Sequence, residues 1–177
     1  MPSEHIGDLK KWVNELARRK NEGDAVRLNR AVELISNYFH VRSHEVAILG
    51  LTADQRSLRF LAPDNLRGVG HIPLSSANSL AARTAREKRP ELFNNFTVVP
   101  HASVFEAVPI AEDMRSDPIQ KIMSSPIILG VQVVGVIQVS RKGKSLADAD
   151  PDFTYPQLRE LKTISDALAP CIILCKD

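Results

Sequence analysis

The stretch SSPIILGVQVVGVIQVS, residues 124–140, decides the fold of this chain. Two runs rich in valine and isoleucine flank a short connection at residues 129–132, which predicts a β-hairpin. The second run is apolar along its length instead of alternating, so we expect both of its faces to be covered. Leu129 and Val131, near the predicted tip, are unusually apolar for a turn. We therefore expect the tip to contact a partner or another element.

The hairpin is followed by Gly143, Lys144 and Ser145, the letters that close a phosphate-binding loop. Such a loop needs another glycine five positions before Gly143, and a helix directly after the serine. Gln138 occupies the first of these positions, and the sequence LADADPDF after Ser145 does not look like a helix that begins at an anion. We interpret the triplet as a basic turn that leaves a strand.

Three segments have the spacing of amphipathic helices. Apolar residues recur at steps of three and four in residues 5–20 and 25–39, with polar and charged residues between them. The sequence NEGD, residues 21–24, separates these two helices, because glycine weakens a helix and aspartate can cap the next one. A third helix begins at Thr154, where Gln157 completes a capping box. Pro170 predicts a kink or an end of this helix near residues 166–169.

The middle of the chain adds strands and one more helix. Residues 44–51 and 56–63 are rich in strand-forming residues and are joined by the polar sequence TADQ, which predicts a second hairpin. A loop over residues 63–73 leads to a helix over residues 75–88, with Ser75 and Ser76 as its cap, and ELFNNF follows as a short strand. This order predicts an α+β domain with a central antiparallel β-sheet of about five to six strands, sandwiched by helices.

Composition excludes several classes of protein. The chain has 177 residues, of which 44% are hydrophobic and 25% charged, which suits one globular domain with a sizeable core. The net charge is only +2, so we expect no nucleic-acid partner. No apolar run is long enough to cross a bilayer, and the N-terminus lacks the apolar core of a signal peptide. We therefore expect no membrane association and a cytoplasmic location.

The sequence has few side chains in patterns suited to metal binding or catalysis. The only cysteines, Cys171 and Cys175, lie in the last apolar segment and are interpreted as buried thiols. The five histidines show no ligand spacing, so we expect no metal site. His71 or His101 is where a haem variant would find its axial ligand, but a lone loop histidine is usually solvated. No catalytic triad can be assembled, and RGVGHIP lacks the third glycine of a dinucleotide fingerprint, so we expect no enzyme.

Taken in order, these elements resemble the GAF domain family, small-ligand sensor domains found in phosphodiesterases, phytochromes, histidine kinases and bacterial transcription activators. Residues 124–140 are similar to the core hairpin of that family, and FTYPQLRELKTISDALAPCI, residues 153–172, is similar to its final helix. The segment IPLSSANSLAARTAREKRPELFNNF, residues 72–96, is similar to the part in which a helix of small residues precedes a short strand. The resemblance covers residues 25–173.

The resemblance implies an organisation for the whole chain. Residues 25–177 would form a GAF-like domain that ends in a C-terminal helix, after an amphipathic helical extension over residues 1–24. A ligand pocket would lie between the sheet and the helices and loops of residues 66–117, and a separate output or effector protein would receive the signal. The first and last helices would form a homodimer, which would cover apolar stripes that have no evident partner in the sequence. The stripe residues are Leu9, Val13, Leu16, Leu28, Ile35, Leu161, Leu168 and Ile172.

Parts of the family's chemistry are missing from this sequence. No cysteine precedes Pro170, so we expect neither a covalently attached bilin nor the chemistry of the methionine sulfoxide reductases on this fold, since both need a pocket cysteine. The Asn-Lys-Phe-Asp-Glu set of the cyclic-nucleotide-binding members has no convincing counterpart, because FNNF, residues 93–96, supplies only asparagine and phenylalanine. Haem is not expected either, and the sequence leaves the identity of any cofactor or ligand open.

The leading hypothesis is a non-enzymatic regulatory domain in signal transduction that binds an unidentified small molecule. Aromatic and polar side chains from loops that face a sheet make an apolar cavity with a few orienting groups. The predicted pocket residues are Phe60, His71, Ser75, Phe96 and Phe105. The alternative is a degenerate domain without a ligand, a dimerisation or protein-interaction module in which these aromatic side chains simply fill the core.

Overall fold

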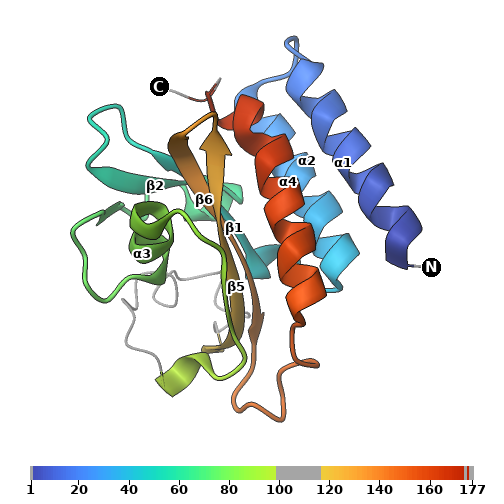
Figure 1. Ribbon diagram of the computed structural model, residues 1–177, viewed down its shortest axis with the longest axis vertical. Helices are drawn as coiled ribbons and strands as arrows, with labels where there is room; N and C mark the ends of the chain where they lie inside the picture. The colour runs from blue at the N-terminus through green and yellow to red at the C-terminus, as the bar shows by residue number, and fades with distance from the viewer. Residues whose placement is uncertain (1, 99–116, 174, 176–177) are drawn as a thin grey trace.

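The computed structural model describes residues 2–98, 117–173 and 175. Its helices are α1 (Pro2–Arg18), α2 (Asp24–Phe39), α3 (Leu80–Glu87) and α4 (Tyr155–Ile173), with short 3-10 turns at Ser43–Glu45, Asp64–Leu66 and Phe96–Val98. Its strands are β1 (Val46–Leu51), β2 (Ser57–Ala62), β3 (His71–Pro73), β4 (Glu91–Phe93), β5 (Ile119–Leu129) and β6 (Gln132–Lys142). Figure 1 shows α2 and α4 beside the sheet, with α1 on the far side of these helices.

The strands form one antiparallel sheet in the order β3-β2-β1-β6-β5-β4. This arrangement confirms the predicted α+β fold with a six-stranded antiparallel sheet. The predicted hairpin of residues 124–140 is the β5–β6 pair, whose arms are longer than expected at eleven residues each. The two edge strands, β3 and β4, are only three residues long.

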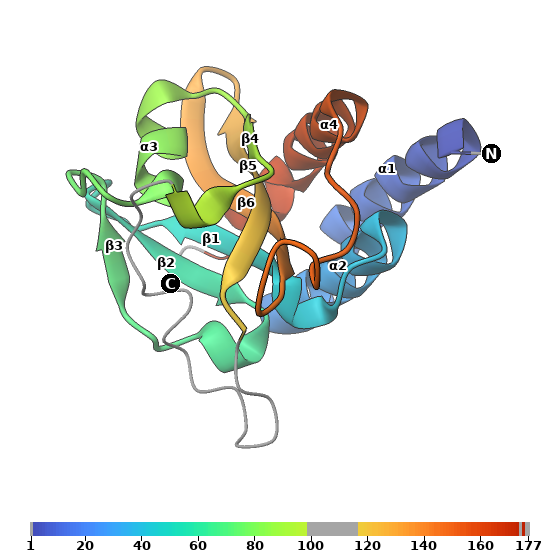
Figure 2. The same cartoon turned by 90° about the horizontal axis from the view of Figure 1, so that it is seen from below.

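Helices cover both faces of the sheet. Helices α1, α2 and α4 lie on one face, and α3 lies on the other, which Figure 2 shows from below. Residues 119–127 of β5 and 134–142 of β6 are all buried, so the expectation that both faces of this hairpin are covered is confirmed. Each face has its own core cluster, with Ile137 in the cluster on the side of the three helices and Val136 in the cluster on the side of α3.

The apolar stripes of the helices are covered within the single chain. All eight stripe residues, from Leu9 to Ile172, are buried at 5% exposure or less and belong to the core cluster of α1, α2 and α4. The expectation that these stripes lack a partner within the chain is therefore wrong, because α2 and α4 pack on the sheet and α1 packs on α2 and α4. A homodimer stays a prediction, and so does the division at residue 24, although α1 shares its core with α2 and α4.

The start of α3 and the end of α4 differ from the ends predicted from the sequence. Helix α3 begins later than predicted, and its cap is Ser79, whose hydroxyl oxygen accepts a hydrogen bond from the N–H of Ala82 (3.2 Å), instead of Ser75 or Ser76. The predicted capping box of α4 is present, because Thr154 N–H donates to Gln157 and Gln157 N–H donates back to the Thr154 hydroxyl. However, α4 does not end near residues 166–169 and continues past Pro170 to Ile173. Leu168, Cys171 and Ile172 are buried on either side of the proline and hold this turn against the core.

The segment after the hairpin is a turn, as the spacing predicted. The N–H of Gly143 donates to the carbonyl of Pro118 (3.1 Å), and the hydroxyl of Ser145 donates to the carboxylate of Asp148 (2.9 Å). The next helix begins at Tyr155, ten residues beyond Ser145. Gly143, Lys144 and Ser145 therefore form no phosphate-binding loop at the start of a helix.

The tip of the β5–β6 hairpin reaches into solvent. Leu129 is 44% exposed and Val131 is 84% exposed. The tip is linked to α3, because the ammonium group of Lys88, at the end of that helix, donates to the carbonyl of Val131 (3.3 Å). This contact uses the backbone, so the two apolar side chains of the tip remain in water.

Strands β1 and β6 meet at a pair of glycines, Gly50 and Gly135. A Cβ atom added to Gly135 would lie 2.2 Å from the carbonyl oxygen of Leu49, a distance at which the backbone itself must move. A Cβ atom on Gly50 would meet only the flexible end of Leu61, at 2.6 Å. The close approach of the two central strands therefore depends on glycine at position 135.

We predict that Gly135→Ala lowers the free energy of unfolding by about 3 kcal/mol, the upper end of the usual cost of overpacking, because the neighbouring atom belongs to backbone. Urea denaturation followed by circular dichroism measures this change. Gly7→Ala on α1 is the matched control, since no atom lies within 4 Å of its added Cβ, and it should leave stability equal or slightly higher. Equal stability of the Gly135→Ala variant and the native chain would contradict the close approach.

Candidate functional site

The face of the sheet under α3 contains a buried polar network within an apolar cluster. Thr84 of α3, Ser124 of β5 and Gln138 of β6 are buried, at 0%, 0% and 6% exposure. Their neighbours are the apolar residues of the α3-side core cluster, among them Leu49 and Val136. Polar groups are usually kept out of such surroundings because their burial costs free energy unless they are hydrogen-bonded. We call Thr84, Ser124 and Gln138 the α3-side polar network.

The hydrogen bonds of this network have one consistent direction. The Thr84 hydroxyl donates to the carbonyl of Leu80 (2.8 Å), so its single proton is engaged within α3. The Ser124 hydroxyl, 2.7 Å from that of Thr84, must then donate to it. Ser124 in turn accepts a hydrogen bond from the side-chain amide of Gln138 (3.2 Å). The network thus holds the Gln138 amide in one orientation and leaves its carbonyl oxygen out of the chain of bonds.

The predicted pocket residues divide into two groups. Phe60 and Phe96 are buried, at 4% and 2% exposure, in the same core cluster on the α3 side. His71, in β3, and Ser75 are exposed at the surface. Phe105 lies outside the described residues. The structure therefore brings the two described aromatic residues together, whereas His71 and Ser75 do not join them in the core.

Sequence reasoning missed the three residues of the α3-side polar network. A signal for two of them existed, because Ser124 and Gln138 are polar residues directly next to apolar ones, Met123 for the first and Ile137 and Val139 for the second. Nothing in the sequence indicates that Thr84 lies opposite them, since that contact joins residues forty positions apart.

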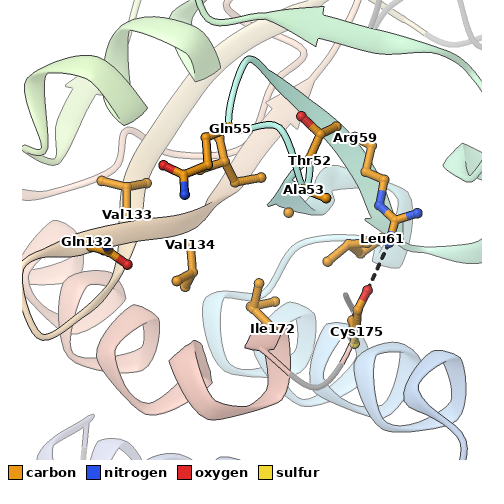
Figure 3. A pocket seen from close by; sticks show the side chains of 12 residues that line it. Thr52, Ala53, Gln55, Arg59, Leu61, Gln132, Val133, Val134, Ile172 and Cys175 are labelled. Atoms are coloured by element: carbon orange, nitrogen blue, oxygen red, sulfur yellow. Dashed lines mark hydrogen bonds between the residues drawn. The ribbon is translucent and has the colours of Figure 1, made fainter. Parts of the chain in front are cut away.

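A small pit lies near the start of β6, beside the turn between β1 and β2 (Figure 3). Its volume is about 50 Å³. Leu61, Val134 and Ile172 form apolar walls, and the Arg59 guanidinium donates to the carbonyl of Cys175 (2.8 Å) at one side. This volume holds a few water molecules or one small side chain, and it is too small for a cofactor.

A larger groove lies on the other side of the sheet, among α1, α2 and the segment that leads into α4. We call it the helix-side groove. Its volume is about 860 Å³, and Trp12 of α1, Tyr38 of α2 and Glu160 of α4 are among its lining residues. Burial, together with the hydrogen bond to Glu160 and the charge of that carboxylate, raises the pKa of Tyr38 to about 12. The Tyr38 hydroxyl therefore stays protonated next to a negatively charged group.

Arg141 of β6 is buried beneath the helix-side groove. Its guanidinium donates to the carbonyls of Phe39 (3.3 Å) and His40 (3.2 Å), at the C-terminal end of α2, where a positive charge is favourable. It also lies over the ring of Phe153, at 4.6 Å from the ring centre. Burial lowers the pKa of Arg141, while the charges of Asp150 and Glu45 act in the opposite direction. These contacts fix the guanidinium between α2, β6 and the segment before α4.

Glu45 is a second buried charge at the same end of β6. Its side chain is 2% exposed and accepts hydrogen bonds from the N–H of Arg42 (2.7 Å), the Arg42 guanidinium (2.9 Å) and the N–H of Lys142 (2.8 Å). Burial alone would raise the pKa of Glu45, but these hydrogen bonds outweigh it and hold the pKa below its usual range. The carboxylate thus joins the turn after α2 to the last residue of β6.

The described residues offer little for catalysis or metal binding. Cys171 and Cys175 are buried on the side of the three helices, away from the α3-side polar network, and burial raises the pKa of both thiols. Residues 2–98, 117–173 and 175 contain no group of three or more histidine, cysteine, aspartate or glutamate side chains that could hold a metal ion. Within the same ranges, no helix is both long enough and apolar enough to cross a membrane.

No protein-family model and no curated protein matches the sequence. Solved structures do match the fold. A GAF domain of a phosphoenolpyruvate-protein phosphotransferase from Acinetobacter has a TM-score of 0.69 at 14% identity, covering 95% of this chain and 92% of that one. The GAF domain of nlh2 from A. aeolicus, in an inactive state, has a TM-score of 0.66 at 12% identity, with 99% and 100% covered. The free methionine-R-sulfoxide reductase of Neisseria meningitidis has a TM-score of 0.65 at 10% identity, with 95% and 88% covered. The chain therefore has a GAF-like fold, and solved structures with this fold include enzymes.

We predict that Glu45→Gln lowers stability at about pH 7 by about 2 kcal/mol, the usual worth of hydrogen bonds to a charged group. A carboxylate whose pKa is lower in the folded state stabilises the fold above its unfolded pKa, about 4.3 for glutamate, and that contribution disappears as the pH falls through the folded pKa. The difference in unfolding free energy between the native chain and the variant should therefore shrink below about pH 4.3. Denaturant titrations across this range measure it. The exposed Glu33→Gln serves as control, and a difference for Glu45→Gln that is independent of pH would contradict the assignment.

Proposed function

We propose that this chain, which has a GAF-like fold, is a non-enzymatic regulatory domain that binds a small molecule on the α3 side of its sheet. The observation that carries the proposal is the α3-side polar network, in which three hydrogen-bonding side chains are buried within an apolar cluster. Ligand sites are mostly apolar with a few well-placed polar groups, and this face has that composition.

A buried core does not need the hydrogen-bonding side chains of this network. An apolar residue of similar size at Gln138 would remove an amide that must otherwise be satisfied in a region of low dielectric constant. A polar chain that is held in one orientation can instead present a hydrogen-bonding group to a ligand. The Gln138 carbonyl oxygen, which the chain of bonds does not use, is the group we assign to this role.

The chemistry of the network favours one class of ligand. Thr84, Ser124 and Gln138 are all uncharged, and the core cluster on the same side of the sheet includes Leu49, Phe60 and Phe96. Such a site suits a ligand with an apolar body and a neutral hydrogen-bond donor. A strongly charged ligand would lack a counter-ion among these side chains.

The positions of the thiols support a non-enzymatic role. Solved structures of this fold include reductases, but both cysteines of this chain lie on the side of the three helices, Cys171 within α4 and Cys175 just after it. Burial raises the pKa of each thiol, which disfavours the reactive thiolate.

A second candidate function is that of an interaction module without a ligand. The observation that favours it is the burial of Phe60 and Phe96, which take up space in the α3-side core cluster. In such a module the α3-side polar network would serve only to hold α3 on the sheet. The partner would then be another protein. The homodimer predicted from the sequence, through the first and last helices, is part of both candidates.

Native mass spectrometry of freshly isolated protein distinguishes the two candidates. We expect a non-covalent adduct on the native chain that is lost on denaturation, and a smaller adduct fraction for Gln138→Leu, because leucine matches the size of glutamine but cannot bond the ligand. Gln132→Leu, an exposed glutamine at the start of β6, is the matched control. Circular dichroism checks that the variants are folded. A folded native chain without any adduct would favour the module, and an adduct unaffected by Gln138→Leu would place the ligand elsewhere.

A further inference from the structure

The helix-side groove is separate from the α3 side of the sheet. Its lining residues come from α1, α2, the end of β6 and the segment that leads into α4, on the face opposite α3 (Figure 1, Figure 2). At about 860 Å³ it falls in the range of sites that enclose a small organic molecule, about 300 to 1,000 Å³. Size alone therefore allows it to act as a second binding site.

The groove has an aromatic and apolar lining that is open to solvent. Trp12 of α1 is 51% exposed although it lines the groove, and Tyr38 of α2 and Pro156 of α4 contribute further apolar surface. Exposed tryptophan is unusual on a helix whose other large apolar residues, Leu9 and Val13, are buried. The indole and phenol rings provide faces on which an organic cation can rest.

The accessible charge of the groove is negative. Asp8, four residues before Trp12, shares its side of α1, and Glu160 lies across the groove on α4. Asp152 also lines the groove and is paired with the ammonium of Lys121 (2.9 Å). The cation beneath the groove, Arg141, is 6% exposed and engaged by the carbonyls of Phe39 and His40. A ligand would therefore meet carboxylates near solvent and a buried positive charge at the base.

We propose that the helix-side groove binds an amphipathic organic cation, a protonated amine with an aromatic or aliphatic body. The ammonium lies between Asp8 and Glu160 near solvent, and the apolar body packs against Trp12 and Tyr38. Tyr38 and Glu160 line the groove together, so the Tyr38 hydroxyl is available to hydrogen-bond the carboxylate while the ligand binds. The buried charge of Arg141 keeps the ammonium away from the base of the groove and so sets the direction of binding.

Trp12 is the only tryptophan of the chain, so its fluorescence reports on this groove alone. The test titrates the full chain with 2-phenylethylammonium and, in parallel, with the neutral 2-phenylethanol, which has the same body without the charge. We expect a saturable change in Trp12 emission with the ammonium, and a dissociation constant at least about tenfold larger for the alcohol. Equal binding of the two compounds, or no saturable change with either, would overturn the proposal.

Variants of the two carboxylates test where the ammonium group binds. Glu160→Gln retains a hydrogen-bond acceptor for Tyr38 but removes the charge, and Asp8→Asn removes the second carboxylate. Each should weaken binding of the ammonium by about fivefold to tenfold and leave that of the alcohol unchanged. Glu33→Gln, an exposed carboxylate of α2 outside the groove, should change neither. Unchanged ammonium binding by the first two variants would overturn the proposal. So would an emission shift that depends on protein concentration without any ligand, because a second copy of the chain would then occupy the groove.

Discussion

The β5–β6 hairpin has no face that can remain in water, and the rest of the fold follows from this constraint. Residues of both strands point apolar side chains to the two sides of the sheet, so each side needs a cover. Helices α1, α2 and α4 supply one cover and α3 supplies the other. The gain from burial, about 1.5 to 3 kcal/mol for each fully buried aliphatic side chain, makes this pair the anchor of the domain.

The two covers are not equivalent in chemistry. The side of the three helices contains buried positive charges. Arg141 and Lys121 lie at the end of the strands where the turn after α2 and the segment before α4 meet them, and Arg27 is buried on α2. The side of α3 instead contains neutral polar groups in its middle. This asymmetry is why the two proposed sites differ in the ligands they suit, a neutral molecule on one side and a cation on the other.

The regular elements could be predicted from local pattern, whereas the contacts between them could not. The continuous apolar run of residues 124–140 and the Thr154–Gln157 capping box are local signals, and both predictions are confirmed. Serine positions were less informative, because Ser75, Ser76 and Ser79 are equally good caps in sequence and only the packing of α3 selects Ser79. The apolar stripes were identified correctly but their partners were not, since periodicity shows that a face must be buried and cannot show against what. The α3-side polar network depends on a contact between residues forty positions apart, so no local pattern could reveal it.

The shortness of the edge strands limits how this domain can meet other chains. Strands β3 and β4 are three residues long, Pro73 ends one of them and Pro90 precedes the other. Proline has no N–H to offer, and three residues present too few backbone groups for a foreign strand to pair with. Along these two edges the sheet is therefore a poor template for β-aggregation or for strand addition by a peptide, and contacts with another chain there would rely on side chains.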